Sequence, residues 1–138
     1  LYVMSRAVWQ KLQIDPDKEI ILLNVPKNYF TLIEWPFEEQ PQQVTKNADF
    51  VHLFTNSFFE LSALLRHAHN SIKQNGTIWI SHYKKASKNE SELDSNLVRG
   101  FALCSGLVDN KICSLDSDWA ACRVVIPVKD RKKKNPLK

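Results

Sequence analysis

The sequence predicts an α/β domain of three layers, with helices on both faces of a mainly parallel β-sheet. Apolar runs of strand length alternate along the chain with segments whose apolar residues recur at helical spacing, an order typical of crossover connections between parallel strands. The last two strand-like runs are joined by a short turn, which predicts an antiparallel hairpin. The 138 residues, of which 43% are hydrophobic, suffice for one domain with its own core.

The first half of the chain contains two runs that are typical of buried strands. Residues 19–25 are almost continuously apolar, which favours a strand covered on both faces, and Pro26 ends it. Residues 37–48 are polar and contain Pro41, and the sequence leaves open whether they are ordered. The expected elements are a helix over 5–14, a strand over 19–25, one or two helical turns over 29–35, a short edge strand near Val44 and a strand over 49–55.

The second half begins with the strongest helix signal in the chain. Ser57 and Glu60 have the spacing of a capping box, and apolar residues follow at helical spacing. The expected elements are a helix from Ser57 that closes at Asn75-Gly76, a strand over 77–81, a helix capped within 91–94 that ends at Gly106, a strand over 107–115 and a last strand over 121–128. If that last strand lies at the sheet edge, it is a candidate for pairing between two copies of the chain.

The basic charge of the chain is concentrated at one end. The formal net charge is +4, but residues 129–138 alone carry +5 and residues 1–128 carry −1. We therefore divide the chain into one domain over 1–128 and a basic tail over 129–138, which we expect to be flexible. A nearly neutral body argues against a broad nucleic-acid-binding face, so we expect only weak contact with nucleic acid, through the tail.

Cysteine usage and hydropathy predict a cytoplasmic protein. Cys104, Cys113 and Cys122 are too few and too widely spaced for a disulfide framework or a zinc site, and we expect them to be small buried hydrophobic residues. No apolar run approaches the roughly 18 residues of a membrane span, and residues 1–15 lack a signal-peptide pattern. A reducing compartment and no membrane partner are therefore expected.

A ligand site is expected beyond the carboxyl ends of the parallel strands, where open α/β sheets bind their ligands. Four loops qualify, and their polar, aromatic and slightly basic side chains suit a small anionic or planar ligand. The loops cover residues 24–28, 56–57, 81–87 and 114–119, and the candidates are Asn24, Asn56, Ser57, Ser81, His82, Tyr83, Lys84, Lys85, Asp116, Asp118 and Trp119. The alternative is that these are ordinary polar loops.

The turn after the first strand argues against a bound nucleotide, and we assign no cofactor. Such a turn needs glycines so that a phosphate or carboxylate can approach bare backbone. The three glycines of the chain are Gly76, Gly100 and Gly106, and residues 24–28 contain none. No dinucleotide or phosphate-loop glycine motif is present elsewhere in the sequence.

Nucleophilic and metal chemistry also lack a signature in the sequence. No G-x-S-x-G elbow occurs, so we assign no catalytic residue. We expect His52, inside a strand, to be a core or edge histidine, and His67 and His69, which do not share a helix face, to be surface residues. His82 is the one histidine at the candidate edge, and no partner carboxylate can be assigned to it. We therefore predict no metal site.

Two sets of motifs resemble known families. Residues 48–57, the helix that follows and N-G-T-I-W-I-S over 75–81 resemble the second half of class I methyltransferases, where a D-x-V strand, a helix and a G-G-x-L-x-I strand succeed one another. L-L-N-V-P (22–26), I-W-I-S-x-x-K-K-A-S (78–87) and G-L-V-D-N-K-I-C-S-L-D-x-x-W (106–119) resemble a bacterial family of short proteins of unknown function with a methyltransferase-like Rossmann fold. The resemblance covers most of residues 5–127 and implies a Rossmann-like fold without a mechanism.

The resemblance also implies which residues line a ligand edge, namely Asn24, Ser81, Lys84, Lys85 and Trp119. The chain departs from working methyltransferases at its glycine-free turn, and Glu38 and Glu39 are the only acids in the region where a ribose-binding carboxylate is expected.

Three functions follow from these observations. The first is a non-enzymatic methyltransferase-like protein that has lost the cofactor loop and binds a protein or a small ligand. The alternative is an enzyme that uses S-adenosylmethionine or another nucleotide ligand in a non-standard pose, with Lys84 or Lys85 supplying charge and Trp119 stacking. A third is contact with nucleic acid through the basic tail. A turn over 24–29 packed shut by Tyr29 or Phe30 would favour the first.

Overall fold

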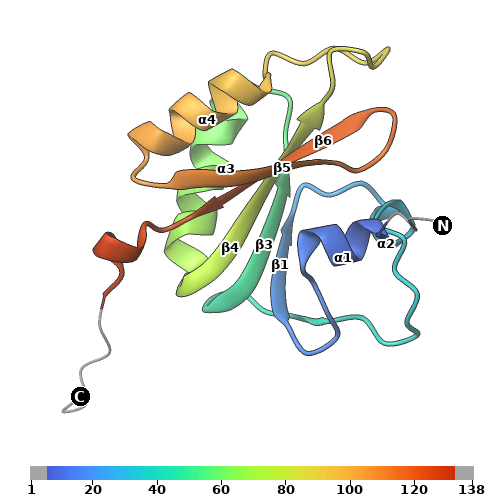
Figure 1. Cartoon of the computed structure of the whole chain (residues 1–138), viewed down its shortest axis with the longest axis horizontal. Coiled ribbons are helices and arrows are strands. Elements are labelled where there is room, and N and C mark those ends of the chain that lie inside the picture. Colours follow the sequence, from blue (N-terminus) through green and yellow to red (C-terminus); the bar gives the residue numbers. More distant parts are fainter. Residues whose placement is uncertain (1–5, 133–138) are drawn as a thin grey trace, which may run out of the picture.

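The computed structural model describes residues 6–132 and contains a six-stranded sheet (Figure 1). In chain order the elements are α1 Val8–Leu12, β1 Glu19–Leu23, α2 Tyr29–Leu32, β2 Gln42–Gln43, β3 Ala48–Phe54, α3 Phe58–Ser71, β4 Ile72–Tyr83, α4 Ser95–Cys104, β5 Val108–Ser114, β6 Trp119–Val125 and the 3₁₀ turn η1 Val128–Asp130. Every strand that the sequence predicts is present, including the short edge strand near Val44, whose N–H donates to Ile20 O at 2.9 Å.

The sheet is parallel over most of its width. Its order is β2-β1-β3-β4-β6-β5, with β2, β1, β3 and β4 parallel and β6 antiparallel to both of its neighbours. The expected antiparallel hairpin is therefore present, but its second strand is inserted between β4 and β5. The last strand, β6, is not at the sheet edge, so the prediction that two copies pair through residues 121–128 is wrong. Strand β5 holds that edge instead.

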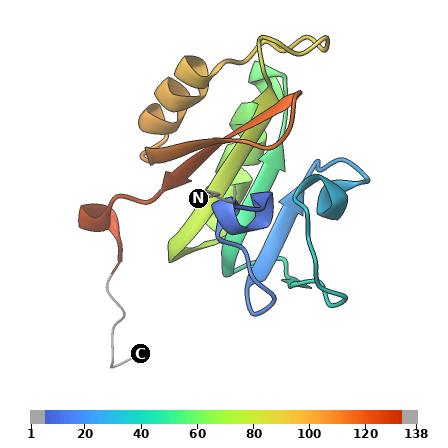
Figure 2. The ribbon, with the colours of Figure 1, turned by 45° about the vertical axis from the view of Figure 1, so that its right-hand side comes forward.

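Helices cover both faces of the sheet, as expected for three layers. Figures 1 and 2 show α3 and α4 on one side and α1 and α2 on the other. The α3–α4 face buries aliphatic side chains such as Leu61, Leu65 and Val98 against the strands. The α1–α2 face buries larger rings, among them Tyr29, Phe54 and Trp79. Apolar burial on both faces explains why β3 is nearly continuously hydrophobic.

Helix α3 ends earlier than the sequence predicts. It stops at Ser71, and β4 begins at Ile72, so Asn75-Gly76 is inside a strand rather than at a helix C-terminus. The register between β3 and β4 is irregular here. A Cβ on Gly76 would lie 2.5 Å from Ile72 Cγ1 and 3.0 Å from Asp49 O, so the glycine is required by this close approach of backbone and side chain.

The remaining helix boundaries and side-chain placements follow the sequence more closely. Asp94 caps α4 by accepting the Leu97 N–H at 2.8 Å, and α4 closes at Gly106, which has φ +81. Helix α1 is shorter than the expected 5–14 because Gln13, at φ 60, ends it, whereas α2 forms one of the one or two turns expected over 29–35. Cys122 is buried and Cys113 partly buried, whereas Cys104 is exposed, which corrects the expectation that all three cysteines are buried.

The basic end of the chain is described only as far as Lys132. Arg131 Nε donates to Ile126 O at 3.0 Å, and Lys132 N donates to Gln74 Oε1 at 2.9 Å, so these two residues contact the domain. The rest of the predicted tail lies outside the described residues, and the division of the chain at residue 128 stays a prediction. Within residues 6–132, no helix has the length and apolar character to cross a bilayer.

Candidate functional site

A cleft of about 620 Å³ opens at the carboxyl ends of β1, β3 and β4. Its position follows from the topology. The strands β1 and β3 are neighbours, but the chain continues from β1 to β2 on one side and from β3 to β4 on the other. Such a switch point leaves a crevice between the loops that diverge from it. The lining residues are Asn24, Val25, Pro26, Phe54, Thr55, Asn56, Ser57, Glu60, Tyr83, Glu92 and Trp119.

Asn24 closes the switch point between β1 and β3. It has φ +57, the left-handed conformation that glycine usually provides, and its Nδ2 donates to Phe54 O at 2.7 Å. The next residues turn at once, since Tyr29 N donates to Pro26 O at 3.0 Å. Tyr29 is buried beneath this turn, and its ring contacts Phe54 and Phe30 edge to face. The amide of Asn24 therefore lies at the gap between the two strand ends.

Aromatic rings form one wall of the cleft. Tyr83 and Trp119 face each other across the β4–β6 pair, with ring centroids 4.1 Å apart and planes tilted by 30°. Phe54 contacts Trp119 edge to face at 4.9 Å. The turn before Trp119 holds it in place, because Asp116 Oδ1 accepts the Trp119 N–H at 2.7 Å. Trp119 is partly exposed and presents a ring surface to the cleft.

The opposite wall is polar and acidic. Glu60 Oε1 accepts the Thr55 hydroxyl at 3.1 Å, and Glu92 Oε1 accepts the Phe58 N–H at 2.9 Å. Asn56 Oδ1 accepts the Tyr83 N–H at 2.7 Å, which ties the β3 loop to β4. None of the lining residues is a lysine or an arginine. The cleft is therefore negatively charged, and the slightly basic edge that the sequence predicts does not form here.

The structure separates the five residues proposed as the ligand edge. Asn24 and Trp119 line the cleft together. Ser81 is fully buried, and its Oγ hydrogen-bonds His52 Nε2 at 2.7 Å, so it lines no cavity. The Lys84 ammonium donates to Ser114 Oγ and Asp116 O and thereby joins its loop to the β5–β6 hairpin. Lys85 lies in a different pocket.

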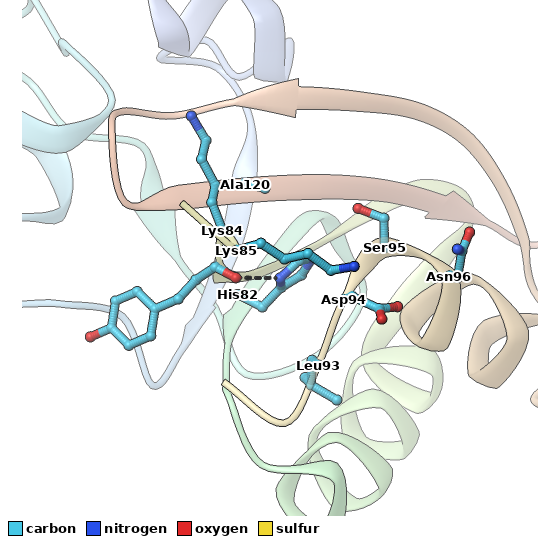
Figure 3. Close-up of a pocket in the computed structure, with 9 residues that line it drawn as sticks. His82, Lys84, Lys85, Leu93, Asp94, Ser95, Asn96 and Ala120 are labelled. Atoms are coloured by element: carbon cyan, nitrogen blue, oxygen red, sulfur yellow. Dashed lines mark hydrogen bonds between the residues drawn. The ribbon is translucent and has the colours of Figure 1, made fainter. Parts of the chain in front are cut away.

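That second pocket, of about 300 Å³, lies beside the cleft, and the two share Tyr83 (Figure 3). Lys85 extends along it toward Asp94 and Ser95 at the start of α4. His82 is 3% exposed, and its Nδ1–H donates to Tyr83 O at 2.9 Å. The pocket thus combines the side chains of Lys84 and Lys85, one carboxylate and an imidazole, without a carboxylate hydrogen-bonded to the ring.

A buried polar chain runs beneath the cleft floor. The Tyr29 hydroxyl hydrogen-bonds His52 Nδ1 at 2.8 Å, and His52 Nε2 hydrogen-bonds Ser81 Oγ at 2.7 Å. Burial lowers the pKa of His52 to about 3 and raises the pKa of Tyr29, so both side chains are neutral near pH 7. The serine and histidine are inaccessible to a substrate, and the prediction that His52 is a core histidine is confirmed.

Sequence reasoning missed the acidic wall. The sequence pattern assigns Glu60 to a helix cap and Glu92 to a capping segment over 91–94, whereas the structure places both side chains beside the same strand ends. A signal was available, since Glu60 lies in the first turn of a helix that begins directly after β3. Within residues 6–132, no group of three histidine, cysteine or acidic side chains is arranged to hold a metal ion.

Comparison with solved structures identifies the fold of this chain. No family model and no curated protein matches this sequence. The structure titled "DhpI-SAH complex structure" aligns with a TM-score of 0.53 and 8% identity over 86% of this chain and 81% of its own. "The structure of LepI complex with SAM" aligns with a TM-score of 0.53 and 11% identity over 86% of this chain and 38% of its own. A putative type 11 methyltransferase from Sulfolobus solfataricus aligns with a TM-score of 0.47 and 14% identity, over 85% and 73% respectively. The chain therefore has a methyltransferase-like Rossmann fold.

Proposed function

We propose that this chain is a non-enzymatic binding protein on a methyltransferase-like fold, and that its 620 Å³ cleft takes a small neutral or cationic ligand with a planar ring. One observation carries the proposal: Asn24 occupies the turn where a cofactor-binding protein of this class needs open backbone. The volume is within the range of small-molecule sites, which is about 300–1,000 Å³.

The closed turn disfavours the usual binding of a nucleotide or methyl donor. The phosphate or carboxylate of such a ligand approaches bare backbone N–H groups after the first strand, and glycine permits that approach. Here the Asn24 amide is committed to Phe54 O, and helix α2 has only four residues and no side-chain cap at its N-terminus. Tyr29 fills the space below the turn, which is the condition that favours a lost cofactor site.

The chemistry of the walls supports the class of ligand. Trp119 and Tyr83 offer ring surface on which a planar group can stack. Glu60 and Glu92 disfavour an anion and favour a neutral or cationic group, because no basic side chain lines the cleft to offset them. A planar neutral molecule such as adenosine is therefore a suitable probe, and a phosphate added to it should weaken binding.

An enzyme that uses S-adenosylmethionine in a non-standard pose is the second candidate. It is favoured by the position of the cleft at the switch point of a fold shared with structures whose titles print SAM and SAH. The sulfonium cation of that ligand would also suit the acidic wall. The two candidates differ in whether the Asn24 turn admits the amino-acid part of the methyl donor.

The proposal is tested by titration with adenosine, AMP, S-adenosylmethionine and S-adenosylhomocysteine. The readout is the indole N–H resonance of Trp119 in ¹⁵N-correlated NMR spectra. Adenosine should shift this resonance saturably and bind about tenfold more tightly at this site than AMP, since the phosphate faces two carboxylates. Trp119→Phe assigns the resonance, and Trp119→Ala should abolish binding measured by calorimetry. Phe59→Ala, which alters an exposed ring outside the cleft, is the matched control.

Three results would count against the proposal. Absence of any saturable shift with adenosine would contradict a small-ligand cleft and leave a protein partner as the remaining form of binding. Binding of S-adenosylmethionine at micromolar strength by the unaltered protein would favour the enzyme. If Asn24→Gly remains folded and gains no affinity for S-adenosylmethionine, the closed turn is not the obstacle.

A further inference from the structure

A pocket of about 250 Å³ lies at the opposite end of the sheet from the cleft, near the amino-terminal ends of β3 and β4. It lies on the α1–α2 face, where Phe50 belongs to the core. The connection from α1 to β1 forms one side and the irregular part of β4 forms the other. The lining residues are Gln13, Lys18, Asp49, Phe50, Asn75, Gly76, Thr77 and Arg123. These side chains are mostly polar.

Arg123 is the unusual group in this pocket. It lies on β6, paired with Trp79 of β4 on one side and with Lys111 of β5 on the other. Its Nε atom is buried and has no hydrogen-bond partner within residues 6–132, and none of the ion pairs among those residues includes it. Burial also lowers the pKa of Arg123, although a guanidinium remains charged near pH 7. A buried donor without an acceptor is costly, and an anion held beside the same guanidinium would offset that cost.

The neighbouring charges leave a local excess of positive charge. Asp49 is the acid in the pocket, and both of its oxygens are occupied: Oδ2 accepts the Glu19 N–H at 2.9 Å and Oδ1 accepts Lys73 Nζ at 2.9 Å. These contacts lower the pKa of Asp49 and offset its charge, despite a partial opposing effect of burial. Lys18 and Arg123 remain as the cations that face the pocket without an ion-pair partner among the described residues.

We infer that Arg123 and Lys18 bind the phosphate group of a small molecule in this pocket. Arginine presents several N–H donors in one plane, which matches the oxygens of a phosphate, and a lysine beside it adds a point charge. Gln13, Asn75 and Thr77 supply neutral polar side chains around the same space. A pocket of about 250 Å³ accommodates one phosphate group with a small substituent, whereas a nucleic-acid backbone would need a longer basic surface.

This site is independent of the proposed function, because the two pockets share no residue and lie at opposite ends of the strands. The inference concerns a ligand of opposite charge to the one proposed for the cleft. Either site can therefore fail without deciding the other.

NMR titration with inorganic phosphate at constant ionic strength tests the inference through the Nε–Hε resonance of Arg123. We expect a saturable shift of this resonance and a smaller response from the other arginines. Arg123→Gln should weaken phosphate binding by about tenfold or more, as expected for loss of charge-assisted hydrogen bonds. Lys18→Gln should also weaken phosphate binding. Because Lys18 lies in a loop outside the core, this second variant distinguishes loss of binding from misfolding of the Arg123 variant.

The controls separate a built pocket from general attraction of anions. Lys27→Gln removes one positive charge at an exposed position at the other end of the strands and should leave phosphate affinity unchanged. A small phosphate monoester should bind at least as tightly as inorganic phosphate and be displaced by it. A shift that does not saturate, equal affinity in Arg123→Gln, or an oligonucleotide that binds more tightly than the monoester would each overturn the inference.

Discussion

The His52 imidazole illustrates how one buried residue makes stability depend on pH. Its pKa falls from 6.5 to about 3 on folding because the folded protein removes it from water. Below about pH 6.5 the unfolded chain therefore binds a proton at His52, whereas the native state does not. The free energy of unfolding consequently falls as the pH decreases from 6.5 toward 3. The Asp49 carboxylate, whose pKa is lowered in the folded protein, adds a further loss of stability only toward the acidic end of this window.

We expect acidification from about pH 7.5 to about pH 5.5 to lower the free energy of unfolding by about 1.4 kcal/mol through His52. Urea unfolding at the two pH values measures this decrease in the free energy of unfolding. His52→Gln should be less stable at the higher pH, since its partners Tyr29 and Ser81 lose the imidazole, but should show a smaller loss on acidification. His67→Gln, at an exposed position, should keep the loss of the unaltered protein. Protonation of His52 in NMR spectra above pH 5 would contradict the argument.

At the same scale, the sequence could predict some site residues and not others. Asn24 directly follows β1 and Trp119 begins β6 after the hairpin turn, so their place in the cleft depends mainly on strand order. Ser81 was included because it ends a predicted strand, but β4 continues to Tyr83, and two further residues place Ser81 inside the core. The directions of Lys84 and Lys85 depend on loop contacts with the distant hairpin, which sequence periodicity does not encode.

Among the elements, helix α4 has one glycine in its interior and another just beyond its C-terminus, and the two should respond oppositely to the same substitution. Gly100 is inside the helix, and a Cβ there would meet no atom within 4 Å. Gly100→Ala should therefore stabilise the protein by about 0.5–1 kcal/mol through helix propensity. Gly106 has φ +81, which an alanine adopts only with strain, so Gly106→Ala should destabilise by about 1–2 kcal/mol. Thermal unfolding of the two variants measures both, and the same sign for both would refute this account.

The boundary between α3 and β4 shows why element ends were harder to predict than the elements. Asn75-Gly76 is a common helix terminator, and the local sequence favours that interpretation. The structure instead uses Gly76 for a close approach between β4 and Asp49 on β3, a contact between residues far apart in the sequence. Strand order could be predicted as mainly parallel, but the insertion of β6 between β4 and β5 is likewise a long-range choice.

For the molecule as a whole, tryptophan fluorescence reports only on the face of the sheet that α1 and α2 cover. Trp79 is buried in the α1–α2 core, and Trp9, Trp35 and Trp119 pack against it, so all four tryptophans of the chain belong to that face. Most of the helical content is in α3 and α4, which have 14 and 10 residues and cover the other face. Fluorescence and far-ultraviolet circular dichroism therefore observe opposite layers.

Because both layers pack on the same strands, we expect the two spectroscopic signals to give one coincident unfolding transition in urea. The Trp119→Phe variant, which retains three tryptophans of that face, serves to check that the fluorescence signal is not dominated by the cleft. A fluorescence midpoint well below the circular dichroism midpoint would instead mean that the α1–α2 layer unfolds by itself.

The position of β6 in the sheet has a consequence for synthesis on the ribosome. Strand β5 leaves the ribosome before β6, yet among the described residues 6–132 its one hydrogen-bonded neighbour strand is β6. Until β6 emerges, the nascent chain therefore presents the bare edge of β4 and an unpaired β5, both of which can pair with strands of other chains. Chaperone occupancy on translating ribosomes should then peak between completion of β4 and emergence of β6, and fall once the hairpin inserts.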